Sequence, residues 1–190
     1  YVITNNHVIE GAKKVAVRNG IGKVTNAKVA ATSKDYDLAI LELENPYPKK
    51  YSINGKDFVT PQPGDDVISI GYPGIGITFE QPTITQGIIS KVFDDEMGIF
   101  LTTAAINSGN SGGPIINSGG EVVGMVVSKL SGGQIQPELV NFGVKIQYIK
   151  NILEENNIDY QSSNNLNEYS TSEIYKLYEK SVLPIWINKN

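Results

Sequence analysis

Short apolar runs recur along this chain, and residues that favour turns separate them. Apolar runs bounded by Gly, Pro, Asn or Ser are typical of β-strands joined by tight connections. The Asn19-Gly20 pair between two of the runs is a hairpin signal. The strands that this pattern predicts lie at about 13–18, 22–31, 38–43, 66–70, 82–92, 99–103, 114–117, 121–128 and 140–146.

Two later stretches have apolar residues at helical spacing instead. The first spans residues 146–157, and the second spans residues 174–182 and is followed by a strand-like run at 183–187. Between them, residues rich in Ser and Asn offer little to bury and indicate a linker. We therefore expect three parts along the chain: a folded domain over 1–158, a linker over 159–172, and a helix plus strand over 173–190.

Composition limits the classes of function. Of the 190 residues, 40% are hydrophobic, which is enough for a sizeable core. The formal net charge is −4 and no basic run stands out, which argues against a nucleic-acid partner. The absence of cysteine excludes disulfides, a thiol nucleophile and cysteine-based zinc sites, and we expect neither metal nor cofactor. No run is long and apolar enough to span a membrane, and the strand-like start leads us to expect further residues upstream.

The segment Gly109-Asn110-Ser111-Gly112-Gly113-Pro114 places a serine among glycines. Glycine lacks a Cβ and adopts positive φ readily, so a sharp turn here would lift the Ser111 hydroxyl clear of the backbone. The same turn would gather backbone N–H groups at one point, as acyl-transfer enzymes require to hold a developing oxyanion. A serine hydroxyl is a weak nucleophile by itself and needs a base.

The candidate base is His7, the only histidine in the chain. It follows a strand-like run and precedes a short turn or helical segment. Asp37 lies directly before the apolar run 38–41 and is the best candidate to orient the imidazole. The order His, Asp, Ser along the chain is that of chymotrypsin-type proteases.

The nucleophile elbow of α/β-hydrolases is a rival reading, because Gly109-x-Ser111-x-Gly113 matches it as well. That elbow requires a helix directly after the serine and a histidine later in the chain. Here Gly112-Gly113-Pro114 disfavours a helix, and no histidine follows Ser111. The rival reading fails unless a histidine lies beyond the end of this chain.

These motifs together resemble the chymotrypsin-fold serine proteases of the HtrA/Deg family, over roughly residues 1–155. The resemblance implies an all-β fold of two six-stranded antiparallel barrels with a C-terminal helix, the first barrel lacking its first strand. The active site would lie in the cleft between the barrels, and the PDZ domain of many members is missing from this chain. The stretches that carry the resemblance are 2–9, 37–41, 85–90 and 104–114.

The resemblance also assigns roles to individual residues. It implies that His7 is the general base, that Asp37 orients the imidazole, and that Ser111 is the nucleophile. The backbone N–H groups of Gly109 and Ser111 would form the oxyanion hole, with Asn110 between them.

Two positions depart from the family pattern. Members often carry Asp where Thr103 stands and Pro where Ser108 stands, on the strand and loop that feed the nucleophile. These departures leave the geometry of that loop open.

A primary specificity pocket is implied in the same way. Ala105 would form its base, and the pocket would contain no buried carboxylate, so we do not expect cleavage after Lys or Arg. An apolar pocket predicts Val, Ala, Ile or Leu at the cleaved position. The expected lining residues are Ala105, Val127, Ser128, Lys129, Phe142 and Gly143.

The expected function is a serine endopeptidase that hydrolyses unfolded or damaged proteins through an acyl-enzyme. The resemblance implies a protein or peptide substrate, an extracytoplasmic location, and a homo-oligomer such as a trimer in a longer protein. Two alternatives stay open. Thr103 and Ser108 would fit a weak or inactive protease fold that serves as a chaperone or binding module, and a small-molecule esterase would use the same triad.

The tail carries a separate hypothesis. Residues 173–187 resemble the helix and first strand that begin an HtrA-type protease domain. The parent protein would then contain tandem protease domains, and the strand at 183–187 would fill the vacant strand position in the first barrel. The alternative is a C-terminal helix that packs on the surface.

Overall fold

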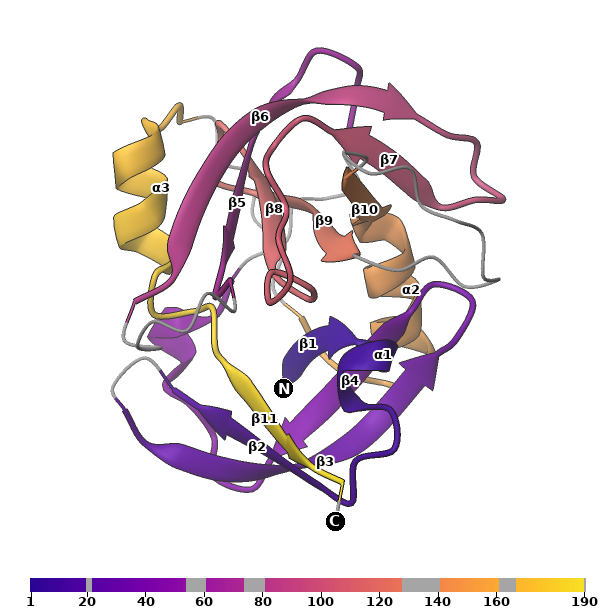
Figure 1. Ribbon diagram of the computed structural model, residues 1–190, viewed down its shortest axis with the longest axis vertical. Coiled ribbons are helices and arrows are strands. Elements are labelled where there is room, and N and C mark those ends of the chain that lie inside the picture. Colours follow the sequence, from indigo (N-terminus) through magenta and orange to yellow (C-terminus); the bar gives the residue numbers. More distant parts are fainter. Residues whose placement is uncertain (20–21, 54–60, 74–80, 128–140, 161–166, 190) are drawn as a thin grey trace.

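Two antiparallel β units build the molecule (Figure 1). The computed structural model describes residues 1–19, 22–53, 61–73, 81–127, 141–160 and 167–189. All nine strands predicted from the sequence form, each within two residues of its expected ends. No helix in these described ranges is long and apolar enough to cross a bilayer.

The first unit is a sheet of five strands. They are β1 (Val2–Asn5), β2 (Lys14–Arg18), β3 (Val24–Ser33), β4 (Leu38–Leu43) and β11 (Ile185–Asn188). Their order across the sheet is β1-β4-β3-β2-β11, and β3 carries an irregularity between Val29 and Ala31. The described residues thus give this unit five strands rather than six, and the fifth comes from the far end of the chain.

The second unit is a closed six-stranded barrel. Its strands are β5 (Asp66–Gly71), β6 (Thr83–Val92), β7 (Ile99–Thr102), β8 (Pro114–Asn117), β9 (Val122–Val127) and β10 (Asn141–Lys145). They close in the order β10-β7-β6-β5-β8-β9. The Phe100 ring fills the interior, and this leaves room only for glycine at the facing position 143, where a Cβ would lie 2.4 Å from the ring.

Strand β4 connects the cores of the two units. Ala39 and Leu41 face the core of the first sheet, together with Val15 and Val17. Leu38 and Ile40 point to the opposite face of β4. There they belong to the larger hydrophobic core, which also contains residues of the second unit. Since successive side chains of a strand point to opposite faces, β4 is buried on both sides and anchors one unit against the other.

The described part of the chain also contains four short helical segments. They are α1 (Asn6–Ile9), the 3-10 turn η1 (Lys49–Tyr51), α2 (Ile146–Glu155) and α3 (Thr171–Tyr178). The predicted helix at 146–157 is α2, which buries its apolar face in the shared core. Helix α3 begins three residues earlier than the apolar spacing predicted, because Ser170 and Glu173 form a capping box at its start.

The C-terminal segment contacts both units. On the second barrel, the Tyr175 hydroxyl donates to the Pro82 carbonyl at 2.9 Å, and the Tyr178 hydroxyl donates to the carbonyl of Gly120. The chain then crosses to the first sheet, where β11 pairs with β2 (Figure 1). Strand β11 therefore adds to the first sheet, in the region where the tail hypothesis placed a strand, while α3 lies on the surface of the barrel.

Candidate active site

Asp37 closes the turn between β3 and β4 in an unusual backbone conformation. Its φ is +52°, in the left-handed region that non-glycine residues seldom adopt. Its carbonyl accepts from the Asn6 N–H and from the Asn5 side-chain amide, both at 3.0 Å. Two residues that directly precede His7 therefore hold the backbone of Asp37.

The Asp37 carboxylate holds His7 at two points. One oxygen accepts from the His7 backbone N–H at 2.8 Å, and the other lies 2.6 Å from the ring Nδ1. A carboxylate only accepts, so the proton of the neutral ring is on Nδ1 and the lone pair is on Nε2. The Asp37 side chain is 10% exposed and the His7 side chain is 23% exposed. Both are therefore largely buried, and the side chain that carries Nε2 is the more exposed of the two.

The loop that carries Ser111 turns on glycines, as predicted. Gly109 and Gly112 have φ of +98° and +83°, and the Gly113 N–H donates to the Asn110 carbonyl at 2.9 Å. Ser111 is half-buried at this turn between β7 and β8. The glycines therefore provide the conformations that the sharp turn requires.

This loop is in contact with both units. The Asn110 side chain is buried against Gly71 of β5, where a Cβ would lie 2.6 Å from the amide oxygen. On the other side of Ser111, Gly112 lies against Thr4 of β1, and a Cβ there would lie 2.5 Å from the threonine hydroxyl. Since β1 leads directly into the helix of the candidate base, the serine loop and the histidine segment meet at the boundary between the units.

Two backbone N–H groups of the loop already donate hydrogen bonds within the protein. The Asn110 N–H donates to the Asn107 carbonyl at 3.0 Å and is thus satisfied within the loop. The Gly112 N–H donates to Val126 on β9 at 3.1 Å. Neither amide is needed for the oxyanion hole that the resemblance implies, which uses Gly109 and Ser111 instead.

The strand that feeds the serine loop is fixed by Thr103. Its N–H donates to the Ile88 carbonyl at 3.0 Å, and its hydroxyl accepts from the Ile88 N–H at 2.9 Å. Next to this point, Gly87 allows the chain to pass directly over β6, because a Cβ there would lie 2.2 Å from the Ala104 nitrogen. The Thr103 side chain thus contributes one hydrogen bond at the exit of β7. Gly87 is required there because the neighbouring chain leaves no room for a side chain.

The expected pocket residues lie in different surroundings. Val127 and Phe142 are buried and pair across β9 and β10, whereas Ala105 is exposed and its carbonyl accepts from the Thr85 hydroxyl at 3.0 Å. Gly143 faces the barrel interior, as described above. Ser128 and Lys129 lie outside the described residues, so the pocket stays a prediction.

The structure brings to the site further residues that were not predicted from the sequence. Asn5 and Asn6 hold the Asp37 backbone, and Thr4 forms the seat of Gly112. The doublet of asparagines directly before a lone histidine was the available signal. Within the described ranges, no group of three His, Asp or Glu residues is arranged to hold a metal ion.

Comparisons with known proteins show the family of this chain. A family model described as the trypsin-like peptidase domain matches residues 1–125. The chain is 38% identical over 165 residues to the serine protease Do-like HtrB of Bacillus subtilis, and 32% identical over 161 residues to the periplasmic serine endoprotease DegP of Escherichia coli. These alignments cover 82% and 80% of this chain but 35% and 32% of the relatives, so the chain spans about a third of their length.

Solved structures give the same fold. The serine endoprotease from Yersinia pestis aligns with a TM-score of 0.64 at 30% identity, covering 81% of this chain and 52% of that one. The HtrA-type protease AlgW with a decapeptide aligns with a TM-score of 0.65 at 27% identity, covering 81% and 47%. The closed barrel and the facing sheet are therefore those of the chymotrypsin-like double barrel. On the family model and on these identities, the chain belongs to the HtrA/Deg family of trypsin-like serine peptidases.

Proposed function

We propose that this chain is a serine endopeptidase domain that cleaves proteins through an acyl-enzyme. The observation that carries the proposal is the two-point grip of the Asp37 carboxylate on His7, at 2.8 and 2.6 Å. A structural aspartate needs no such arrangement, whereas a catalytic histidine needs its tautomer fixed and its ring oriented. The names of the relatives, which are serine proteases and endoproteases, support the same reaction.

In the proposed mechanism, Nε2 of His7 takes the proton of the Ser111 hydroxyl as its oxygen attacks the scissile carbonyl. The proton then passes from Nε2 to the leaving amine, and the new carboxyl end of the substrate stays esterified to Ser111. Water repeats the sequence, releasing the acid and restoring the serine. Asp37 stabilises the imidazolium that forms in each half-reaction.

The oxyanion that develops at the carbonyl would accept from the N–H groups of Gly109 and Ser111. The positive φ of Gly109 is the kind of conformation that turns successive amides toward one point. The contact of Gly112 with Thr4 holds the loop close to the histidine segment. The catalytic groups would then stand at the boundary of the two units, within reach of an extended peptide.

The proposed substrates are unfolded protein segments, cleaved after a small or branched apolar residue. Val127 and Phe142, both buried and apolar, favour such a pocket if it opens where the resemblance places it. An extracytoplasmic location fits the relatives named as periplasmic, and a homo-oligomer of the longer protein stays a prediction.

The experiment uses a fluorophosphonate probe and casein. The purified chain is expected to be labelled on Ser111 and to release peptides from casein, while Ser111→Ala does neither. The exposed neighbour Ser108 provides the matched control, since Ser108→Ala should keep both activities. Equal casein cleavage by the parent chain and by Ser111→Ala would refute the assignment, and labelling with ester hydrolysis but no peptide release would identify an esterase.

A further inference from the structure

Tyr36 connects the turn of the proposed catalytic aspartate to the second unit. It directly precedes Asp37, and its ring lies 4.1 Å from the ring of Tyr148, centroid to centroid, with 37° between the planes. Tyr148 belongs to α2, at the end of the barrel. A residue next to Asp37 is therefore anchored on an element that is far away in the sequence.

The seat under the two rings is completed by Gly98. A Cβ at this position would lie 2.8 Å from Tyr36 and 2.8 Å from Tyr148, so both rings rest on the glycine backbone. Gly98 has φ of +64° and ends the turn between β6 and β7, residues 93–98. Three elements thus meet at one point: the β3–β4 turn, the β6–β7 turn and α2.

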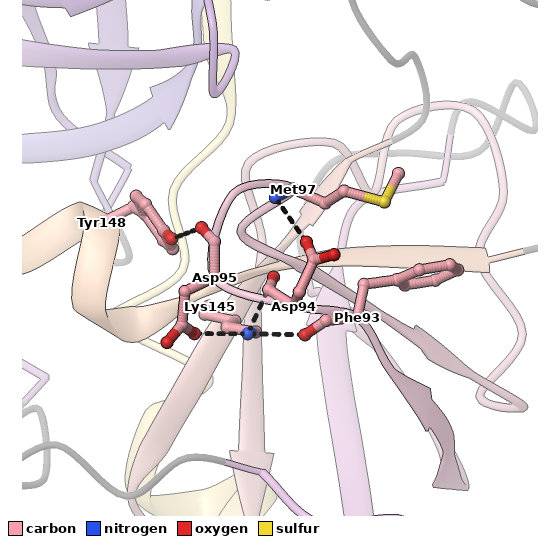
Figure 2. Close-up of polar contacts among 6 residues, drawn as sticks. All are labelled: Phe93, Asp94, Asp95, Met97, Lys145 and Tyr148. Atoms are coloured by element: carbon pink, nitrogen blue, oxygen red, sulfur yellow. Dashed lines mark hydrogen bonds and ion pairs between the residues drawn. The ribbon is translucent and has the colours of Figure 1, made fainter.

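Lys145 holds the β6–β7 turn in place (Figure 2). Its side chain is only 5% exposed, and its ammonium donates to the carbonyls of Phe93 at 2.8 Å and Asp94 at 3.3 Å. It also pairs with the Asp95 carboxylate at 3.0 Å, and its backbone N–H donates to the Gly98 carbonyl at 2.9 Å. Lys145 therefore holds both ends of the turn, the first part through its ammonium and Gly98 through its backbone N–H, and a buried charge needs such partners to be stable.

The hydroxyl of Tyr148 adds a further tie, because it donates to the Asp95 carbonyl (Figure 2). Burial raises the pKa of this hydroxyl above its usual range, and the neighbouring Tyr36 and Asp95 raise it further. The hydroxyl therefore keeps its proton and remains a donor at neutral pH. A hydrogen bond therefore joins the β6–β7 turn to the Tyr148 side chain.

The β3–β4 turn is closed by the antiparallel pairing of Ser33 with Leu38, and Asp37 lies within this turn. The Asp37 N–H donates to the Lys34 carbonyl at 3.3 Å, which is a long bond. The positive φ of Asp37 costs free energy and persists only where the surroundings impose it. On the C-terminal side, Asn5 and Asn6 donate to the Asp37 carbonyl. On the N-terminal side, the ring of the preceding residue, Tyr36, packs against Tyr148.

We propose that Tyr36 is a positioning residue for the His7–Asp37 pair, seated on Tyr148 and on the turn that Lys145 clamps. This inference rests on the proposed function, since it names what holds the proposed orienting carboxylate in place. Loss of the ring frees the peptide before Asp37, and the carboxylate no longer meets the imidazole in a single geometry. The second barrel would then control the histidine pair without touching substrate.

The test follows the single imidazole of the chain. His7 is the only histidine, so a single low-field signal in the proton NMR spectrum reports the hydrogen bond from Nδ1–H to Asp37. No residue-specific assignment is needed to identify this signal. Tyr36→Ala is expected to weaken or broaden this signal and to lower kcat at least about tenfold with little change in KM, since small misplacements of catalytic groups cost this much. Tyr36→Phe keeps the ring and should restore both readouts.

Two further variants separate positioning from a loss of stability. Gly98→Ala inserts a methyl group between the rings, leaves every residue of the pair unchanged, and should reproduce the effect in a folded protein. Tyr175→Ala removes a tyrosine contact of α3 elsewhere and should leave the histidine signal and kcat unchanged. The inference is overturned if Tyr36→Ala, folded by circular dichroism, keeps the signal and kcat of the parent, or if Tyr175→Ala loses them equally.

A failure of the positioning role of Tyr36 can be distinguished from a failure of the proposed function. If the parent chain does not label with a fluorophosphonate, the protease assignment fails, yet the proton signal still reports whether Tyr36 positions the His7–Asp37 pair. If the parent labels and cleaves but Tyr36→Ala is unaffected, only the positioning role fails.

Discussion

Replacing Asp37 by asparagine tests the proposed chemistry most directly, because the structure predicts which tautomer results. Asparagine offers one oxygen and one NH₂ group in place of two acceptors. The His7 backbone N–H is always a donor, so the amide oxygen must stay opposite it, where the 2.8 Å bond is formed now. The NH₂ group then faces Nδ1 at the position of the present 2.6 Å contact.

A donor opposite Nδ1 requires the Nδ1 lone pair, so the ring proton moves to Nε2. In that tautomer Nε2 cannot accept the serine proton. The same change in a Ser-His-Asp protease lowers kcat about 10⁴-fold, which corresponds to about 5.4 kcal/mol of lost transition-state stabilisation. We expect a loss of this size for Asp37→Asn, with a fold and stability close to those of the parent.

The assay compares kcat on an apolar chromogenic peptide, and nitrogen NMR of the single histidine identifies the protonated ring nitrogen. Asp35→Asn is the matched control, because this exposed carboxylate lies in the same turn, two residues before Asp37. Activity of Asp37→Asn within about tenfold of the parent would refute the reasoning. So would a proton that stays on Nδ1.

Three further predictions follow from contacts in other regions. Gly112→Ala should abolish most activity and lower the free energy of unfolding by about 1–3 kcal/mol. Gly64 also has a positive φ, of +98°, but has open space around it, so Gly64→Ala should keep activity. Chemical unfolding and casein assays check both variants. Ser170→Ala should cost about 1 kcal/mol of unfolding free energy by urea titration, and it should raise the pKa of Glu173, which the Ser170 hydrogen bonds now hold low. Burial, with Tyr169 and Glu121 nearby, raises the pKa of Tyr178, so its contribution to stability is complete below about pH 10 and is lost as pH rises through the folded pKa. Unfolding curves between about pH 9 and 11 should show this decline, and a smaller one in Tyr178→Phe.

The sequence predicted the strands well because each is a short apolar run between turn residues. The run at 38–43 is a strand with those ends, since Asp37 and Asn45 bound it on either side. Helix α3 begins earlier than predicted because its first residues, Ser170 to Ser172, are polar and look like part of the Ser- and Asn-rich linker. Local polarity alone does not distinguish a helix cap from a loop.

Some features of the candidate site could be predicted from the sequence, and others could not. The pair of His7 and Asp37 was predictable because each lies in a motif at the boundary of a strand. The positive φ of Asp37 left no trace in the sequence, because aspartate gives no such signal by itself. The contact of Tyr36 with Tyr148 was also hidden, since it depends on how two distant elements pack.

The pairing of β11 with β2 has a consequence for how the chain folds as it is synthesised. Strand β2 leaves the ribosome long before its partner β11, because most of the chain described here lies between Arg18 and Ile185. Until β11 arrives, the N–H and C=O groups along that side of β2 lack the strand that pairs with them in the structure, and such an open edge invites association between nascent chains. The exposed Trp186 and Ile187 reach this edge late, so we expect aggregation during synthesis to depend on how quickly β11 docks.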